Sequence, residues 1–540
     1  MTLTCVNKTE LVIAGPGAGK THDMVGRIVE ALPSLAPTRY MAAITFTNAA
    51  ANNIRDRVHR VRRPGPNVFI GTIHSFANRF ILAPFARPFE RLPNDRIFAA
   101  VEIDVSKSGT GKKPLLPAGR NAVRKAITEK LLRKGVVPYS EMIALCCELF
   151  ENTRVVNMVC NRLQFLFVDE FQDVDTRQFE LFERLRKAKR TQIYAVGDPE
   201  QFIYSFTYGQ RGVKVPSFAR IPFSRLSKVA KPGLIDVNRR SCQEIVKFTN
   251  HFRVEPKQQS GVGARGEPRV LFLPETDLAS IIKRFRQCGL HIPQRRGEMK
   301  RLHLAYKNVM FDEVRQQFGI RHISNSARQN KTLLQDALEF LAMCRGTSQR
   351  RACEELKISE HEWRKWGLSL LRNLGDNQLL DIDQTVEQWL PKLGVTVGLQ
   401  EREKAVMEMC AQLKAAIALG RTAQGEDWSS SIHRAKGLEA STVLVVASSL
   451  NELNKWCTTD RNSRNADKVD TCRIGFVGFT RAMELLCIGS CERLTPQTRT
   501  RLECLGVSVL STENPRPSEQ MEFIPVSREV NTLPFITSAE

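Results

Sequence analysis

The residues best suited to chemistry in this sequence form the stretch AGPGAGKT, from Ala14 to Thr21. It follows the apolar run LVIA and precedes a helix-forming stretch, which is the context that a phosphate-binding P-loop needs. Glycines let successive backbone N–H groups face one concave, anion-binding surface, and the start of a helix adds its dipole. We expect Lys20 to contact the β- and γ-phosphates and Thr21 to bind Mg²⁺. The expected phosphate-binding residues are Ala14, Gly15, Pro16, Gly17, Ala18, Gly19, Lys20 and Thr21.

A pair of carboxylates, Asp169 and Glu170, follows the apolar run LQFLFV at residues 163–168. With a P-loop upstream, Asp169 is placed to hold Mg²⁺ and Glu170 to polarise an attacking water. The alternative is structural, because Asp and Glu are also favoured as caps at the start of a helix. Small-molecule kinases and transporter ATPases would share both motifs, so the rest of the chain must decide between these classes.

Short apolar runs alternate with helical stretches along the first half of the chain. The expected strands are residues 11–14, 41–46, 68–71, 163–168 and 192–196, and helices are expected at 49–61 and 178–189. This alternation favours a parallel sheet covered by helices on both faces. A second series of expected strands comprises residues 268–273, 301–305, 441–447 and 484–488. The sequence therefore predicts an α/β protein with two such cores.

The bulk properties limit the partners and the compartment. The 540 residues carry a net charge of +23, which favours a polyanionic partner such as nucleic acid. The 14 cysteines include no paired CxxC motifs with zinc-finger spacing, and scattered thiols fit a reducing compartment. We find no signal peptide and no apolar run near the ~18 residues of a membrane span, so a cytoplasmic location without membrane contact is expected.

The remaining motifs, in chain order, resemble those of the UvrD/Rep-like superfamily 1A helicases. Together with the P-loop, the matching stretches are TFTNAAANNIRDRV at 45–58, GTIHSF at 71–76, VDEFQD at 168–173, VGDPEQFIYSF at 196–206, NRRSCQEIV at 238–246, SIHRAKGLE at 431–439 and VGFTRA at 477–482. Any one of them could be an ordinary turn or core segment. Eight ordered matches at sensible spacing make coincidence negligible.

The resemblance implies a role for each matching residue at an ATP and Mg²⁺ site. Gln201 is expected to sense the γ-phosphate, while Arg240 and Arg481 reach across from the second core as arginine fingers. The expected catalytic residues are thus Lys20, Asp169, Glu170, Gln201, Arg240 and Arg481, the metal ligands Thr21 and Asp169, and the further nucleotide contacts Arg239, Gly437 and Glu439. The matching DNA-contact positions are Thr47, Asn48, His74, Ser75, Tyr204, Phe206 and His433.

The resemblance also implies two RecA-like domains, 1A and 2A, each interrupted by a mainly helical insert. The expected divisions are 1–83 and 156–235 for 1A, 84–155 for insert 1B, 236–345 and 428–510 for 2A, 346–427 for a reduced insert 2B, and 511–540 for a flexible tail. Two departures bear on specificity. No glutamine stands among residues 1–10, where relatives carry an adenine-reading one, and Arg239 replaces a base-stacking tyrosine. Selectivity for ATP over other nucleoside triphosphates is therefore left open.

The trimmed architecture is similar to the helicase-like subunits of Gabija antiphage systems. Shared features are the short N-terminus, an IxxPF element at residues 81–85 and the RxCQxI pattern around Cys242. This similarity implies an OLD-family endonuclease as a partner in a large hetero-oligomer. Three functions stay open. The first is a processive 3′→5′ helicase on single-stranded or end-containing DNA, acting in antiphage defence or as a stand-alone DNA repair helicase. The second is a DNA-gated nucleotidase that licenses a partner nuclease with little unwinding, and the third is a catalytically inactive binding module. The presence of every expected catalytic residue disfavours the last.

Overall fold

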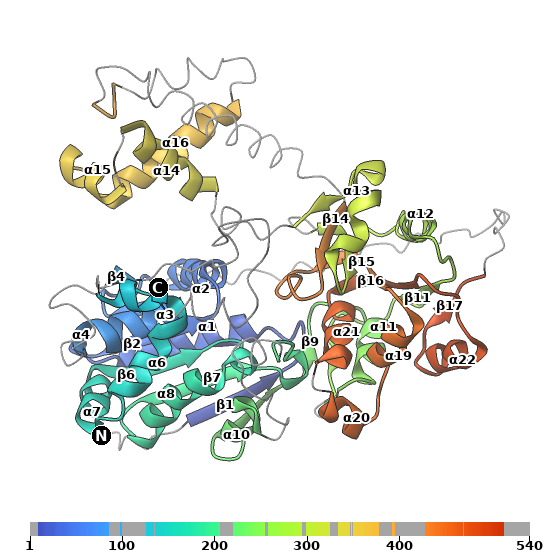
Figure 1. Ribbon diagram of the computed structural model, residues 1–540, viewed down its shortest axis with the longest axis horizontal. Helices are drawn as coiled ribbons and strands as arrows, with labels where there is room; N and C mark the ends of the chain where they lie inside the picture. The colour runs from blue at the N-terminus through green and yellow to red at the C-terminus, as the bar shows by residue number, and fades with distance from the viewer. Residues whose placement is uncertain are drawn as a thin grey trace, which may run out of the picture.

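The computed structural model describes residues 9–85, 98–99, 126–133, 136–205, 220–253, 257–293, 299–323, 333–345, 347, 349–376, 391–394, 427–467 and 469–511. Its two large β-sheets, of six and seven strands, lie side by side (Figure 1). We call the described residues within 9–235 the first lobe, and those within 236–323 and 427–511 the second lobe. The α/β class with two parallel-sheet cores is confirmed.

The first lobe is built on a six-stranded sheet in the order β3-β2-β6-β7-β1-β8, in which every pair is parallel. Its strands are β1 (Thr9–Ala14), β2 (Tyr40–Thr45), β3 (Val68–Thr72), β6 (Leu163–Val168), β7 (Gln192–Gly197) and β8 (Lys231–Ile235). Buried side chains form one hydrophobic cluster on each face of this sheet, which explains why the strands are nearly continuous apolar runs. The five strands expected here are confirmed, whereas β8 was missed.

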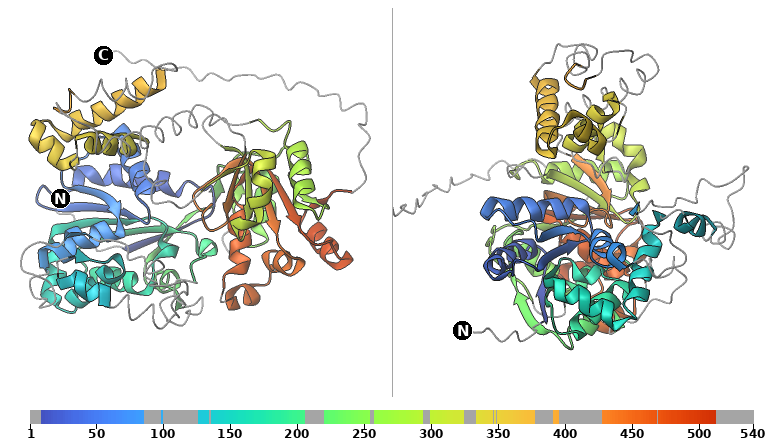
Figure 2. Two further views of the ribbon diagram at one scale, coloured as in Figure 1. Left: turned by 45° about the horizontal axis from the view of Figure 1, so that its top comes forward. Right: turned by 90° about the vertical axis from the view of Figure 1, so that its left-hand side faces the viewer.

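Helices cover both faces of this sheet (Figure 2). They are α1 (Lys20–Ala31), α2 (Asn48–Val61), α3 (Ile73–Ala77), α4 (Ala83–Phe85), α6 (Tyr139–Leu149), α7 (Thr153–Arg162), α8 (Thr176–Lys187) and α10 (Pro222–Leu226), with the short turns η1 (Leu32–Ser34), η2 (Asn78–Leu82), η3 (Phe171–Asp173) and η4 (Pro199–Gln201). The expected helices at 49–61 and 178–189 are confirmed as α2 and α8. A two-stranded ladder joins β4 (Phe98–Ala99) to β5 (Val136–Val137).

The second lobe carries a seven-stranded parallel sheet in the order β13-β14-β12-β15-β16-β11-β17. Its strands are β11 (Val270–Leu273), β12 (Met299–Ala305), β13 (Arg321–His322), β14 (Asp427–Ser431), β15 (Ala440–Ala447), β16 (Ala482–Ser490) and β17 (Ser508–Val509). The four expected strands are confirmed. Strand β14 was missed because its sequence, DWSSS, lacks an apolar run, although it is held between β12 and β13.

The helices of the second lobe are α11 (Gln243–Asn250), α12 (Leu278–Cys288), η6 (Asn308–Phe311), α13 (Asp312–Phe318), α19 (Leu450–Trp456), α20 (Arg461–Ala466), α21 (Thr471–Phe479) and α22 (Pro496–Cys504). A short parallel ladder between β9 (Val237–Asn238) and β10 (Gln259–Ser260) lies where the chain passes from the first lobe to the second. This ladder matters for function because the residues next to it, Arg239 and Gln258, contact the glycine-rich loop.

A separate helical unit consists of α14 (Leu333–Arg345), α15 (Gln349–Leu356) and α16 (Glu360–Asp376), which share one hydrophobic cluster around Phe340 and Trp363. Because α14 precedes residue 346 and yet joins this cluster, we propose that the second insert begins at α14. The expected tail at 511–540 lies outside the described residues, apart from residue 511.

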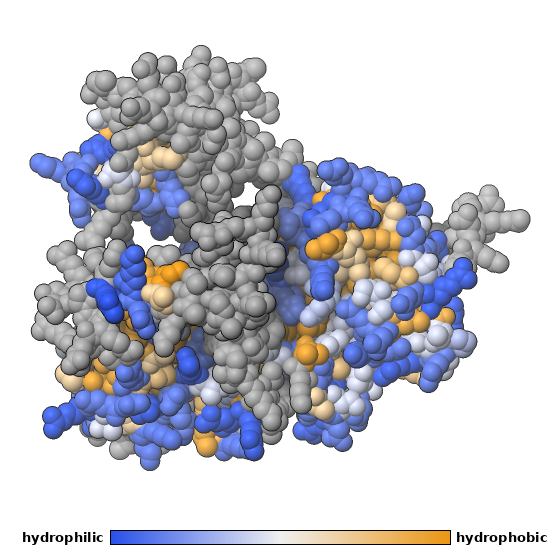
Figure 3. Space-filling view, viewed as in Figure 1, coloured by the Kyte–Doolittle hydropathy of each residue, from blue (hydrophilic) through white to orange (hydrophobic). Residues whose placement is uncertain are grey.

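Where Figure 3 colours the two lobes, hydrophilic residues predominate, with smaller hydrophobic areas among them. Within the described part of the chain, no helix combines the length and the apolar character that crossing a membrane requires.

Candidate active site

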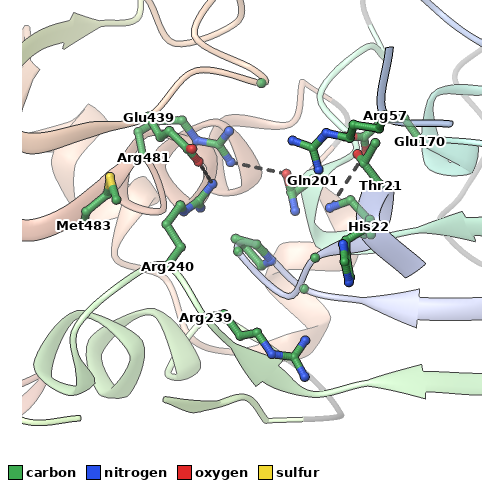
Figure 4. Close-up of a pocket in the computed structure, with 16 residues that line it drawn as sticks. Thr21, His22, Arg57, Glu170, Gln201, Arg239, Arg240, Glu439, Arg481 and Met483 are labelled. Carbon is green, nitrogen blue, oxygen red and sulfur yellow. Dashed lines mark hydrogen bonds and ion pairs between the residues drawn. The ribbon is translucent and has the colours of Figure 1, made fainter. Parts of the chain in front are cut away.

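A cavity of about 330 Å³ lies between the two lobes (Figure 4). The first lobe lines it with Gly15, Pro16, Gly17, Gly19, Lys20, Thr21, His22, Arg57, Glu170 and Gln201, and the second lobe with Arg239, Arg240, Gly437, Glu439, Arg481 and Met483. Cationic groups from both lobes therefore face one space. Such an arrangement suits a multiply charged anion, since positive groups in a partly enclosed site attract it strongly.

The glycine-rich loop follows β1 and leads into α1, as the sequence predicted. Gly17 and Gly19 adopt left-handed backbone conformations with φ of 67° and 88°, which glycine tolerates without steric cost. Gly19 occupies the N-cap of α1 and provides no side-chain cap, so the first-turn N–H groups are available to an anion. The Nζ of Lys20 lies 3.5 Å from the carbonyl oxygen of Ala14 and 4.0 Å from a carboxylate oxygen of Glu170.

The second lobe contacts this loop directly. The backbone N–H of Arg239 donates to the carbonyl oxygen of Gly17 at 2.9 Å, and Nε2 of Gln258 donates to that of Pro16 at 3.1 Å. A Cβ added to Gly17 would lie 2.6 Å from Oδ1 of Asn238 and 2.7 Å from Cβ of Arg240. The two lobes thus meet at a position where only glycine fits.

Replacing Gly17 by alanine is expected to weaken both folding and nucleotide binding. The left-handed backbone and the lost clearance should lower the free energy of unfolding by about 1–3 kcal/mol. Gly26 is the matched control, because it is exposed on α1 and an added Cβ would meet nothing within 4 Å. Gly26→Ala should stabilise the protein by about 0.4–1 kcal/mol.

Guanidinium denaturation and titration with a fluorescent nucleotide analogue measure the two effects. Equal unfolding free energies for the Gly17→Ala and Gly26→Ala variants would contradict the close packing described here.

The acidic pair stands at the end of β6, beside the loop. Burial and the neighbouring Glu170 raise the pKa of Asp169 to about 7. Burial alone would raise the pKa of Glu170 as well, but Lys20 and Lys436 outweigh it and hold this pKa at about 2. Glu170 also accepts a hydrogen bond of 2.6 Å from Nε2 of Gln172. The carboxylate of Glu170 is therefore charged and oriented at neutral pH, as a group that polarises water must be.

The alternative role of this pair as a helix cap is wrong. The next helix, α8, is capped by Asp175, whose side chain accepts from the backbone N–H of Gln178 in a reciprocal capping box. Glu170 precedes the short turn η3 without capping it through its side chain, and its own backbone is left-handed with φ of 49°. Such strain in a non-glycine residue is typical of functional sites.

The second lobe places two guanidinium groups opposite Lys20. Arg481 donates from Nη2 to Oε1 of Gln201 at 3.3 Å, and Arg240 donates from Nη1 to Oε2 of Glu439 at 3.0 Å. Burial, together with the nearby charge of Arg240, lowers the pKa of Arg481 to about 9. Two cations held this close together favour an anion between them, since it removes their mutual repulsion.

Not every residue expected at the site lines the cavity. Ala14, Ala18 and Asp169 are buried beside it. The expected nucleotide contacts Arg239, Gly437 and Glu439 do line it. His22, Arg57 and Met483 also face the cavity and were missed. His22 could have been inferred because it directly follows Thr21, whereas Arg57 and Met483 reach the cavity only through tertiary packing.

The residues expected to contact DNA lie outside this cavity, as far as the structure describes them. Oγ1 of Thr47 accepts from the N–H of Ala50 and caps α2, beside Asn48, while the Ser75 hydroxyl lies 3.0 Å from that of Thr72. Each of the two histidines has an aromatic neighbour: the ring pairs His74–Tyr139 and His433–Tyr306 have centroid distances of 5.1 and 5.6 Å. Tyr204 packs under Nζ of Lys436 at 5.1 Å. Phe206 lies outside the described residues.

Comparison with known proteins places these features in a family context. A family model described as an AAA domain matches residues 1–207. ATP-dependent DNA helicase PcrA of Bacillus subtilis is 26% identical over 44% of this chain and 36% of its own length. DNA helicase II of Escherichia coli is 27% identical over 50% of this chain and 42% of its own length. The matched region thus spans less than half of either helicase.

A third relative matches over most of its length. Gabija protein GajB of Bacillus cereus is 26% identical over 82% of this chain and 87% of its own length. The resemblance to UvrD-like superfamily 1 helicases, and to GajB in particular, is therefore confirmed.

Proposed function

We propose that this protein is an ATP-driven DNA translocase and helicase of the UvrD/Rep type that moves 3′→5′. The supporting observation is the single cavity that Lys20 and Glu170 share with Arg240 and Arg481. Hydrolysis of a triphosphate builds negative charge at the transferred phosphoryl group, so cations from two lobes accelerate it only when the cleft is closed. Opening and closing of the cleft can then be converted into steps along a strand.

Magnesium fits the donors beside the loop. Thr21 and Asp169 would hold it, since a hydroxyl and a carboxylate are the hard oxygen ligands that this ion prefers, and it would neutralise charge on the β- and γ-phosphates. The raised pKa of Asp169 reflects burial beside another carboxylate, a setting that a divalent cation relieves. No group of three or more His, Cys, Asp or Glu side chains converges within the described ranges. This agrees with an ion that takes most of its ligands from phosphate and water.

Each catalytic side chain has a distinct role in this proposal. Lys20 and the loop N–H groups bind the phosphates, and Glu170 orients and polarises the attacking water. Gln201 and Arg481 contact the γ-phosphate together, because they already form a hydrogen bond. Arg240 adds the second cation from the other lobe, and Glu439 contacts the ribose.

For DNA, we propose the backbone contacts Thr47, Asn48, His74 and Ser75 and the base contacts Tyr204, Phe206 and His433. Aromatic stacking suits a motor because every base has a π-face, so movement tolerates any sequence. The net charge of +23 supports a polyanionic partner.

The match to GajB over 82% of this chain supports a role in antiphage defence as the helicase-like subunit of a Gabija complex. The partner in that complex would be an OLD-family endonuclease of the GajA type. The second candidate function is a DNA-gated nucleotidase that licenses this nuclease with little unwinding. The same match favours it, because the match covers 87% of GajB but only 36% of the helicase PcrA.

A strand-displacement assay separates these two functions. The substrates are duplexes with a 3′ or a 5′ single-stranded tail, offered to the purified protein with ATP and Mg²⁺. A helicase of the proposed polarity should unwind the 3′-tailed duplex and spare the 5′-tailed one. Hydrolysis stimulated by DNA without displacement of either strand would favour the sensor, and preference for the 5′ tail would contradict the proposed direction.

A further inference from the structure

The segment from Asp198 to Ser205 follows β7 and connects the two lobes through its side chains. It contains Gln201, which faces the cavity, and Tyr204, a proposed base contact. The side chain of Phe202 joins the hydrophobic core of the first lobe, whereas that of Ile203 joins the core of the second. This inter-lobe segment is therefore packed into both cores at once.

Buried charges fasten the same segment to the second lobe. Oε2 of Glu200 lies 2.9 Å from Nη2 of Arg464 and 3.7 Å from Nε of Arg473, with all three side chains at most 5% exposed. Oδ2 of Asp198 lies 2.7 Å from Nη1 of Arg253, and this pair is also buried. All three arginines belong to the second lobe.

A backbone hydrogen bond also joins the C-terminal end of the segment to the second lobe. The N–H of Ser205 donates to Oδ2 of Asp470 at 2.8 Å. Asp470 is held in a left-handed conformation with φ of 58°, at the N-cap of α21. A strained residue that receives a hydrogen bond from the other lobe indicates that this junction is tightly specified.

The position of Gln201 follows from these contacts. Its Nε2 donates to Oδ2 of Asp198 at 2.9 Å, its Oε1 accepts from Arg481, and its carbonyl oxygen accepts from Lys436 at 3.0 Å. The neighbouring Glu200 fixes the backbone of this turn against Arg464. Buried ion pairs of this kind are expensive to break because a charge is left without its partner.

We propose that Glu200, Arg464 and Arg473 form an inter-lobe clamp that positions Gln201 and couples contact with DNA at Tyr204 to hydrolysis in the cavity. This inference rests on the proposed function and adds residues that lie outside the nucleotide site. Among the three, none lines the cavity, so they are positioning residues and not catalytic ones. The clamp holds Gln201 and Arg481 together. When a bound strand displaces Tyr204, the movement is therefore transmitted to the contact of Gln201 and Arg481 with the γ-phosphate.

Arg464→Ala tests the clamp, with Arg464→Lys as the variant that keeps the charge. The control is Arg265→Ala, which breaks a two-pronged ion pair with Glu484 at 2.8 and 2.9 Å inside the second lobe alone. The turnover rate and KM of ATP hydrolysis are measured with and without single-stranded DNA. For Arg464→Ala we expect the ratio of DNA-stimulated to basal turnover to fall by about tenfold, a usual size for coupling between two sites, with KM changed less than about twofold. Arg464→Lys should restore part of the ratio, and Arg265→Ala should leave it unchanged.

Hydrogen–deuterium exchange of the amides in 198–205 gives a second measurement that does not need DNA. Exchange should accelerate in Arg464→Ala and not in Arg265→Ala. An unchanged stimulation ratio or unchanged exchange in Arg464→Ala would overturn the clamp, while leaving the proposed function standing. If the wild-type protein shows no stimulation by DNA, the proposed function fails, and the exchange measurement alone decides whether the clamp exists.

Discussion

Replacing Arg481 by alanine is expected to lower the turnover of ATP hydrolysis by about 10³-fold or more, the scale on which arginine fingers act in phosphoryl transfer. The group is buried in the second lobe, where it donates to Gln201 and, through Nε, to the carbonyl oxygen of Val477 at 2.9 Å. Because its charge is needed when negative charge develops on the phosphoryl group, KM should change far less than turnover. Arg481→Lys should recover little, since an ammonium cannot reproduce the planar set of donors.

Steady-state kinetics with saturating single-stranded DNA measure this effect. Arg493→Ala is the control, because Arg493 is exposed in the same lobe, just after β16. Since Arg481 is buried, a thermal melt must accompany the assay, and Arg240→Ala serves as a second variant whose side chain faces the same cavity. Turnover within a factor of a few of the wild-type value in both variants would show that the second lobe takes no part in hydrolysis.

Replacing Lys20 by alanine should reduce turnover by about 10²- to 10³-fold, as expected when one preorganised donor to a developing charge is lost. Unlike Arg481→Ala, it should also weaken nucleotide binding, because Lys20 sits in the loop that would hold the β- and γ-phosphates in the ground state. Its ammonium also lies 4.0 Å from a carboxylate oxygen of Glu170. Burial raises the pKa of Glu170, and the positive charge of Lys20 is the main influence that lowers it. Loss of this charge should therefore raise the pKa of the Glu170 carboxylate.

A phosphate-release assay measures the loss of turnover, and an equilibrium titration with a nucleotide analogue measures the loss of nucleotide binding. Lys231→Ala is the control, because Lys231 is exposed on the edge strand β8. Unchanged turnover in Lys20→Ala would place the nucleotide site elsewhere in the molecule. Comparison of Lys20→Ala with Arg481→Ala also tests whether the two residues have different roles, since only Lys20 is expected to contribute to both nucleotide binding and the chemical step.

The two arginines and the lysine explain why hydrolysis can report on the arrangement of the lobes. Lys20 belongs to α1 of the first lobe, whereas Arg240 and Arg481 follow β9 and α21 of the second. Any motion that separates the lobes withdraws positive charge from the phosphates, and the barrier rises accordingly. The same dependence would also serve the sensor, and the strand-displacement assay separates it from the motor.

The local features of the site were predictable because each depends on short-range physics. The glycines at 17 and 19 supply the left-handed turns, the apolar run at 163–168 forms a buried strand, and the acidic pair follows it. Such signals depend on backbone freedom, on hydrophobic periodicity and on residue order, all of which a sequence displays directly. The family resemblance added the roles of Gln201, Arg240 and Arg481, which no local pattern would have supplied.

The sequence alone determined the two-core α/β class, the glycine-rich loop and the acidic pair, because neighbouring residues encode them. Tertiary structure decided the rest. It brought Arg57 and Met483 to the cavity, inserted Gln258 against the loop, and buried the serine-rich strand β14 within a sheet. It also joined Glu200 to Arg464. These contacts depend on how the two sheets pack against each other. The free energy of that packing comes from burial and charge pairing between distant segments, and such contacts leave no periodic pattern in the sequence.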